Sequence, residues 1–569
     1  MDSINEQSAA QGGSQQDRGP TTTIEPEAKR VRDTEEKSPD TVILEGNQEV
    51  AYENEIFYLD GLRFWGACML LSIMFFLVSM EISVVTTAMV GISKELGEFD
   101  SVSWILSSYL LGYVAVVIIF AKFSDIFGRR QILVTCIFIF TVFSGACGAA
   151  QTMTQLIILR AFQGMGGGGS FAMNMIFLIE MVPASKYAQL VANMGFPSAI
   201  ALGLGPVIGG GITSNTTWRW VFLMNVPIGA SAIALAFLAI PRTFPYSEHS
   251  STSLHWSSLR AFDRVDILGS GLLLLATLAV TAGFEEADSL FPWKSAYVIS
   301  LLTIGGLLWI LFSFWERHVT LAKSNREAVL PWRFFSERAL VGILLGEVML
   351  GGPMTVTVFQ LPQRFQIING LSSVDAGVRL VPFGVTVPIG AMLGSRIAGN
   401  LRVPPIFVAI GGAILQVVGF ALLSQLPSTT QIPPSVYGFQ VLCGIGVGAT
   451  YQSLYILVPL IVGIKDQAVG MGAATQFRMM GGAIVLALST SVFNSHVLPA
   501  LDELGLSGSS RNLPQTIALI EKTDVLASLR SSLSEGYNRQ MYVLCASAAA
   551  QALAALLVLK RKQWILPEQ

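Results

Sequence analysis

Four charged side chains interrupt long apolar stretches of this sequence: Glu81, Arg160, Glu347 and Arg478. A charge inside a membrane-spanning stretch is costly unless it is paired or hydrated, so each is a candidate for function. A low dielectric favours the uncharged form of a carboxyl group, which would let Glu81 take up a proton on one side and release it on the other. The alternative is that Glu81 is a structural acid paired with an arginine. Glu347 is a second candidate for a proton site. A polar contact in helix packing explains this residue equally well.

The apolar stretches that carry these charges determine the class of protein. Of 569 residues, 52% are hydrophobic and only 13% are charged, and the mean hydropathy is +0.59, which is too apolar for a soluble enzyme of this size. A helix needs about 20 apolar residues to cross a membrane, and about fourteen such runs follow one another here. We predict an all-α polytopic membrane protein with spans at 64–90, 103–122, 131–150, 156–182, 188–212, 220–240, 265–284, 296–315, 340–361, 376–398, 404–424, 436–461, 467–493 and 541–559.

Charge, cysteine spacing and motifs argue against several other classes of protein. A net charge of −3 gives no electrostatic basis for binding nucleic acid. The five cysteines lie in predicted spans and lack the spacing of a metal or redox site, so we expect no metal and no disulfide framework. The sequence contains no recognisable nucleophile and base pattern and no ATP-binding signature. We therefore predict a membrane protein that is not an enzyme and needs no cofactor.

The predicted spans group into two halves of six helices with two further helices between them. Paired halves of this kind form a substrate cavity near the membrane midplane and rock around it. We predict a disordered N-terminal tail at 1–60, a first six-helix bundle at 61–242, linkers with two extra helices at 243–338, a second bundle at 339–562 with a long external loop at about 494–540, and a tail at 563–569.

Lysine and arginine residues in the short loops predict the orientation. They gather after the second, sixth and eighth spans and in the C-terminal tail, which places both termini in the cytoplasm. The N-terminus lacks the apolar segment of a cleavable secretory signal, so the first span is expected to be the membrane anchor. Asn215 then lies outside the cell within a glycosylation pattern, although its closeness to the membrane counts against modification.

The segment AKFSDIFGRR at residues 121–130 resembles the cytoplasmic signature of the major facilitator superfamily. An acid, a glycine and a basic pair recur there at this spacing, and here they are Asp125, Gly128, Arg129 and Arg130. Asp125 could pair with a basic group or cap a facing helix, and Gly128 permits a tight turn. The resemblance implies a conformational switch that holds one state and releases it in the other.

Two further segments resemble motifs of the superfamily. The resemblance of LRAFQGMG at 159–166 implies that Arg160 assists proton transfer by biasing a nearby acid. The segment GLGPVIGG at 203–210 resembles a motif of proton-coupled antiporters, in which a proline frees a backbone carbonyl and glycines let a neighbouring helix approach. A packing kink without any bearing on coupling is the alternative. The residues concerned are Gly203, Gly205, Pro206, Gly209 and Gly210.

The segments MEISVVTTAM at 80–89 and WRWVFLMNVPIG at 218–229 resemble drug:proton antiporters with fourteen spans, with Glu81 in place of that family's aspartate. The resemblance covers about residues 60–560, and the polar tail and long final loop resemble fungal members that export toxins or other secondary metabolites. It implies a proton-coupled efflux pump of the plasma membrane that works by alternating access. Its expected partners are a small amphipathic or hydrophobic substrate, protons and the lipid bilayer.

Polar and aromatic residues within the predicted spans are candidates for the wall of the substrate cavity. Packing or lipid-facing positions are the alternative for each of them. Uptake by a related carrier, for example of a siderophore, and a membrane sensor that binds its ligand without moving it remain alternative functions. The candidate wall residues are Tyr109, Gln163, Phe196, Phe359, Gln360, Gln363, Gln440, Tyr451, Gln452 and Arg478.

Overall fold

Every predicted span that lies in the described part of the chain corresponds to helix. The computed structural model describes residues 58–96, 102, 104–183, 186, 189–190, 193–242, 244–245, 263–288, 291–322, 326–429, 431–463, 466–503 and 523–566. The predicted N-terminal tail at 1–60 lies almost wholly outside these residues. The described helices all belong to one compact unit that spans 54–569.

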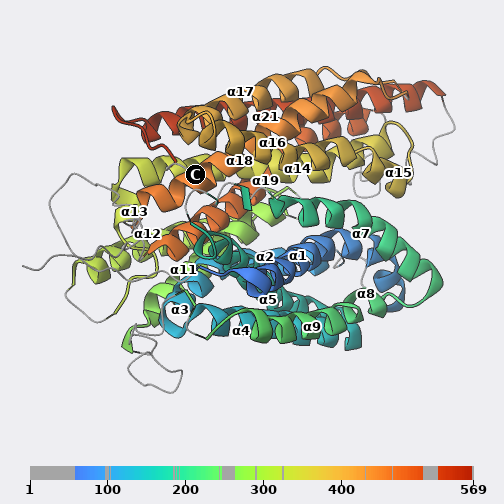
Figure 1. The fold of residues 1–569 in the computed structure, drawn as a ribbon. Helices are drawn as coiled ribbons and strands as arrows, with labels where there is room; N and C mark the ends of the chain where they lie inside the picture. The colour runs from blue at the N-terminus through green and yellow to red at the C-terminus, as the bar shows by residue number, and fades with distance from the viewer. Residues whose placement is uncertain are drawn as a thin grey trace, which may run out of the picture. The chain divides into compact units, whose positions relative to one another are not determined.

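The first half of this unit is a bundle in which α1 packs on α7, α5 packs on α2 and α4, and α9 packs on α1 and α4 (Figure 1). The side chain of Thr152 caps α5 by accepting a hydrogen bond from the Gln155 N–H. The helices are α1 (Gly61–Leu96), α2 (Trp104–Ala115), α3 (Val117–Phe127), α4 (Arg129–Ala149), α5 (Met153–Glu180), α7 (Gly195–Asn215), α8 (Arg219–Leu223) and α9 (Asn225–Ala239).

The second half is a bundle in which α18 packs between α16 and α17, while α21 packs on α14, α17 and α19. Its helices are α13 (Arg333–Ser336), α14 (Arg338–Ile367), α15 (Ser373–Val378), α16 (Val381–Gly399), α17 (Pro405–Leu423), α18 (Ser435–Ile461), α19 (Gln467–Glu503) and α21 (Thr523–Val558).

Two helices of the connecting segment form a pair of their own. They are α11 (Ile267–Glu286) and α12 (Ala296–Leu321), capped by the side chains of Asp266 and Ser295. Helix α11 contacts α2 of the first bundle and α19 of the second. The connecting helices therefore touch both halves, and α11 forms part of the boundary between them.

Eleven of the described helices are long and apolar enough to cross a membrane, or twelve if α2 and α3 form one span with a 42° bend. Helices α5 and α7 have 28 and 21 residues and occupy the predicted fourth and fifth spans, but they are not among these. Arg160, Gln163 and several glycines lower the hydropathy of α5. The all-α membrane fold is confirmed. The length and apolarity of the described helices do not confirm the prediction of fourteen spans.

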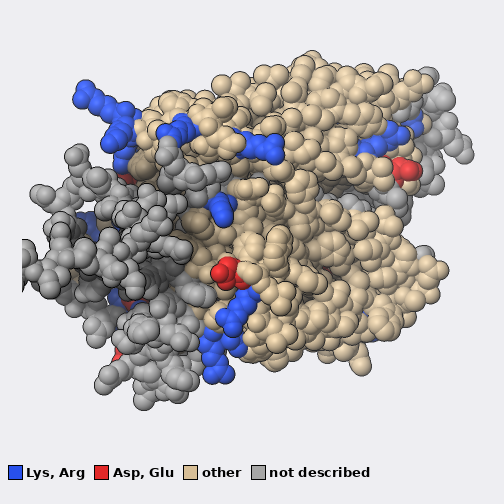
Figure 2. All heavy atoms as spheres, in the orientation of Figure 1, with Lys and Arg blue, Asp and Glu red and all other residues tan. Residues whose placement is uncertain are grey.

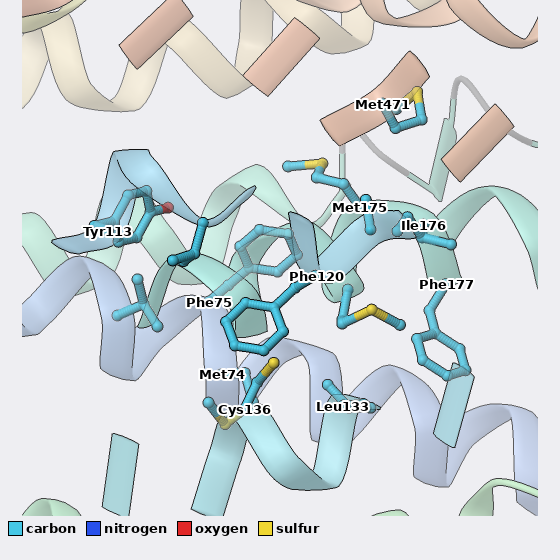
Figure 3. Close-up of a cluster of buried hydrophobic side chains, with 14 of the residues drawn as sticks. Met74, Phe75, Tyr113, Phe120, Leu133, Cys136, Met175, Ile176, Phe177 and Met471 are labelled. Atoms are coloured by element: carbon cyan, nitrogen blue, oxygen red, sulfur yellow. The ribbon is translucent and has the colours of Figure 1, made fainter. Parts of the chain in front are cut away.

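Buried hydrophobic side chains fill the first bundle and continue onto the second. Figure 3 shows Met74, Phe120, Cys136 and Phe177 from four helices of the first bundle, with Met471 of α19 nearby. On the face drawn in Figure 2, few charged groups interrupt the broad tan surface over the helices. Such a surface suits a lipid environment, because no water is available there to solvate charges.

The loop between α19 and α21 is shorter than the predicted range of 494–540. Helix α19 continues to Glu503, and α21 already begins at Thr523. The reason is an apolar contact at helical spacing that joins the two extensions, with Phe493, Val497 and Leu501 on one side and Leu529, Leu533 and Tyr537 on the other. Residues 504–522 lie outside the described part of the chain.

Candidate functional site

An ion pair lies inside the first bundle with no exposed surface. Arg160 of α5 places Nη1 2.5 Å from Oε1 of Glu81 on α1, and both side chains are 0% exposed. Burying two charges costs several kcal/mol for each unless they are paired and hydrogen-bonded. The pair is thus the most polar feature of an otherwise apolar core, and it joins two residues that the sequence marked separately.

Amide side chains complete the coordination of the Glu81 carboxylate. Gln163 Nε2 donates to Oε1 at 3.0 Å, and Asn225 Nδ2 donates to Oε2 at 2.6 Å. Both amides also donate to Ser144 Oγ, each at 3.0 Å, and that hydroxyl donates to the Phe222 carbonyl at 2.9 Å. All of these donors favour the ionised carboxylate, so protonation of Glu81 would weaken several contacts at once.

The Arg160 guanidinium connects this network to α2. Its Nε donates to the Ile105 carbonyl at 3.0 Å, and the guanidinium carbon lies 4.3 Å from the centre of the Tyr109 ring. Nη2 of Arg160 has no hydrogen-bond partner among the described residues. A cation over an aromatic face is stabilised by the ring quadrupole, so Tyr109 supports the charge of Arg160.

A cavity of about 660 Å³ lies beside this network, between the two halves. Val78, Ser79 and Ile82 of α1 line it, within three residues of Glu81. On α2, Leu106 and Leu110 line it, one residue after the positions that contact Arg160. The cavity and the network of the ion pair therefore occupy adjacent faces of α1 and α2.

The two halves also meet where α3 packs on α19. The Ile118 N–H donates to Gln476 Oε1 at 3.1 Å, because the break at Val116 leaves that N–H without a partner in its own helix. A Cβ added to Gly472 would lie 2.9 Å from Cβ of Ala121, so the two backbones are nearly in contact. In the predicted orientation this is the cytoplasmic side.

The structure divides the candidate cavity residues into two groups. Six of them line the cavity: Phe359, Gln360, Gln363, Tyr451, Gln452 and Arg478. The other four are not among the described residues that line it. Tyr109 and Gln163 belong to the buried network, Gln440 is buried within α18, and Phe196 lies in the first turn of α7.

A second pair of opposite charges lies in the second bundle. Arg478 Nε of α19 is 3.8 Å from Oε2 of Glu347 on α14, which is an ion pair without a direct hydrogen bond. The Arg478 guanidinium lies 4.7 Å from the centre of the Tyr451 ring. Arg478 faces the cavity, whereas Glu347 is completely buried behind it.

The switch segment forms a compact charge cluster between α3 and α4. Arg129 Nη1 lies 2.5 Å from Asp125 Oδ1, and Arg129 also binds both carboxylate oxygens of Glu180 at the end of α5. Gly128 has a φ of +100°, which a residue with a side chain rarely adopts. Arg130 points away from this cluster and donates to the Ile240 carbonyl.

The glycine motif lies in α7, where α7 packs on α1. A Cβ at Gly205 would overlap the hydroxyl of Ser83, and one at Gly209 would overlap that of Thr87. Gly210 faces open space within 4 Å. Gly203 and Pro206 lie in the same helix, and Asn215 is its exposed last residue. The close contact thus begins two residues after Glu81 along α1.

Sequence reasoning missed several residues of the site. Asn225 and Ser144 are short polar residues in apolar runs, and Asn225 stands inside the segment at 218–229, whose resemblance to antiporters gives no role to single residues. Glu180 ends a span, where an acid is unremarkable. Glu285 and Glu286 follow the predicted seventh span at 265–284 and look like its polar flank, but both line the cavity.

Comparison with known sequences gives consistent relatives. Residues 71–486 match the family model described as Major Facilitator Superfamily. The chain is 36% identical over 513 residues to "MFS-type transporter FPY5" of Fusarium mangiferae, covering 89% of this chain and 85% of that protein. It is 31% identical over 446 residues to "Efflux pump FUS6" of Gibberella fujikuroi, covering 77% and 76%.

Solved structures share the fold at low sequence identity. A bacterial homologue of the human lysosomal transporter Spinster, in an inward-facing and unoccupied conformation, has a TM-score of 0.55 at 15% identity over 89% of this chain and 99% of that chain. The human organic anion transporter MFSD10 has a TM-score of 0.55 at 13% identity over 88% and 100%. With the family match and its relatives, these findings show that this chain belongs to the major facilitator superfamily of membrane transporters.

Proposed function

We propose that this protein is a proton-coupled efflux carrier that moves a small amphipathic or hydrophobic compound out of the cell by alternating access. The observation that carries the proposal is the fully buried ion pair of Glu81 and Arg160 beside a cavity between two helical halves. The names of its relatives, among them "Efflux pump FUS6" and "Efflux pump DEP3" of Alternaria brassicicola, support export as the direction.

The proposed mechanism links the charge of Glu81 to the shape of the cavity. A proton on Glu81 removes the carboxylate that holds Arg160, Gln163 and Asn225 in place. Arg160 is then free to move relative to Ile105 and Tyr109 on α2. Because adjacent faces of α1 and α2 line the cavity, this rearrangement would alter substrate binding.

The switch segment would govern which side of the membrane the cavity faces. Arg129 holds Asp125 and Glu180 together, so α3, α4 and α5 move as one body while these contacts last. The contact between α3 and α19, where Ile118 donates to Gln476, would have to break for the cavity to open toward the predicted cytoplasmic side. The plasma membrane location and cytoplasmic termini are part of this proposal.

Reconstituted vesicles test the proposed function. Purified protein in sealed vesicles is given an imposed proton gradient, and the movement of a panel of hydrophobic fungal metabolites and dyes is followed. We expect compounds to move against the proton gradient in vesicles with the wild-type protein and to stop moving with Glu81→Gln. Transport that is indifferent to the gradient would contradict proton coupling, and accumulation in the direction of the protons would instead favour uptake.

A further inference from the structure

Two adjacent carboxyl groups line the cavity from the helix between the bundles. Glu285 and Glu286 are the last two residues of α11, and both belong to the cavity wall together with Thr281 of the same helix. They lie outside every segment that resembles a motif of the superfamily. The connecting helix thus contributes directly to the site, in addition to joining the two halves.

Contacts along α11 hold these two residues in place. Ser107 on α2 lies beside the Glu285 carboxylate, and both residues line the cavity. On the other side, Gln476 of α19 donates to Thr277 at 3.0 Å. Beyond the helix end, Asn494 of α19 donates to the Asp288 carbonyl at 2.8 Å. The end of α11 is therefore fixed between α2 and α19, at the boundary of the two bundles.

One oxygen of the Glu286 carboxylate is buried without a partner. The side chain is 3% exposed, and Oε2 has no hydrogen-bond partner among the described residues. An ionised carboxylate that is buried without a partner is strongly disfavoured, and a second acid beside it adds repulsion. Such an arrangement is stabilised by a positive charge supplied from the cavity.

The described residues of the cavity do not provide that charge. Arg478 is the only basic residue among those that line it, and Arg478 already lies 3.8 Å from Glu347 and over the ring of Tyr451. The charges of Arg478 and Glu347 cancel each other. When ionised, Glu285 and Glu286 therefore give the cavity wall a net negative charge. The cavity is thus electrostatically suited to a cation.

The rest of the wall indicates the kind of molecule that carries this cation. Phe75, Tyr113, Phe171 and Phe359 line the cavity, and most of the remaining wall is aliphatic. Aromatic faces attract cations and also bind apolar groups. A ligand that fits both features has one positive group on a largely apolar body.

We propose that Glu285 and Glu286 form a subsite for the positively charged group of an otherwise apolar substrate. This inference rests on the proposed transport function and adds a chemical class of substrate. The apolar body lies against the aromatic wall, and the cation lies at the end of α11, where it compensates the unpartnered oxygen of Glu286.

A matched pair of ligands tests the subsite by binding to purified protein, without any transport. The probes are the tetraphenylphosphonium cation and the neutral triphenylphosphine oxide. We expect the wild type to bind the cation more tightly than the neutral compound. Glu286→Gln should weaken binding of the cation about tenfold or more, which corresponds to about 1.4 kcal/mol, and leave the neutral compound unchanged. Glu286→Asp, which keeps the charge, should restore part of the preference.

The controls separate a binding role from a structural one. Glu503→Gln removes an exposed acid at the end of α19 and should change neither ligand. Equal weakening of both ligands by Glu286→Gln would overturn the proposal, as would a wild type without preference for the cation. Glu285→Gln is the second variant and should also lower the preference. Proton-driven movement of a neutral compound with no cation preference would leave the transport proposal intact while refuting this subsite.

Discussion

Arg160 and Glu81 form an ion pair at 2.5 Å, although they belong to different helices and are 79 residues apart in sequence. Ser144, Asn225 and Tyr109 surround the pair, so five helices of the first bundle meet around one carboxylate. A change in the charge of Glu81 therefore alters contacts of α1, α2, α4, α5 and α9 together.

Removal of Arg160 should destabilise the first bundle. Arg160→Met leaves the Glu81 carboxylate buried and unpaired, which costs about 3–5 kcal/mol when one partner of a buried pair is lost. We expect a lower melting temperature in detergent and a partial recovery in the double variant Glu81→Gln with Arg160→Met. A melting temperature of Arg160→Met equal to that of the wild type would show that the ion pair does not stabilise the bundle.

Two glycines of α7 should differ sharply in their tolerance of alanine. Gly205→Ala places a methyl group on the Ser83 hydroxyl and should cost about 1–3 kcal/mol through overpacking. Gly210→Ala, five residues away, enters open space and should stay within about 0.5 kcal/mol of the wild type. Thermal unfolding of both variants checks this, and equal melting temperatures would argue against a close contact of α7 with α1.

The contact that ties the connecting segment to the switch segment should depend on pH. Glu327 accepts a hydrogen bond from Lys122 at 2.7 Å and pairs with Arg264. Burial alone would raise the pKa of Glu327, but Lys122 and Arg264 lower it below its ordinary value. Its stabilisation is therefore complete above the unfolded pKa of about 4.3 and is lost as the pH falls through the lower folded pKa.

Glu327→Gln should accordingly lower stability by roughly 1 kcal/mol near pH 7, and the difference from the wild type should shrink below about pH 4. Melting temperatures across this range measure the effect, with Glu503→Gln as an exposed control. A difference that stays constant with pH would mean that the charge of Glu327 is not what stabilises the contact.

Within the switch segment, Arg129 should matter more than Asp125. Arg129→Gln leaves both Asp125 and Glu180 without their arginine, whereas Asp125→Asn keeps the contact between Arg129 and Glu180. We expect Arg129→Gln to slow transport at least tenfold, which corresponds to about 1.4 kcal/mol, and Asp125→Asn to slow it less. Initial rates at saturating substrate measure this, with Glu503→Gln, an exposed acid of α19, as the control. A larger loss of transport rate with Asp125→Asn than with Arg129→Gln would show that Asp125 is the more important residue of the switch segment.

The sequence indicated the membrane fold and the charges at its centre, because charged residues in apolar runs are conspicuous. It could not indicate which charges meet. The contact of Glu81 with Arg160 depends on how α1 and α5 pack, and both helices are apolar over most of their surface, so periodicity does not orient them. For the same reason Tyr109 and Gln163 seemed as suitable for the cavity as Tyr451 and Gln452.

The sequence also did not predict correctly where helices end and which residues at their ends reach the cavity. Glu285 and Glu286 follow an apolar run and resemble an ordinary helix flank, and only the position of α11 between α2 and α19 brings them to the cavity. The extension of α19 to Glu503 was missed because its apolar residues recur only once per turn, which is too sparse for a membrane span.

Proton coupling through Glu81 is tested most sharply by proton movement that a substrate gradient drives. Vesicles with a trapped pH indicator and no imposed proton gradient receive a gradient of a transported compound, and the internal pH is followed. We expect protons to move opposite to the compound with the wild type and with Glu95→Gln, an acid of α1 outside the network, but not with Glu81→Gln. Undiminished proton movement with folded Glu81→Gln would contradict a coupling role for this carboxylate.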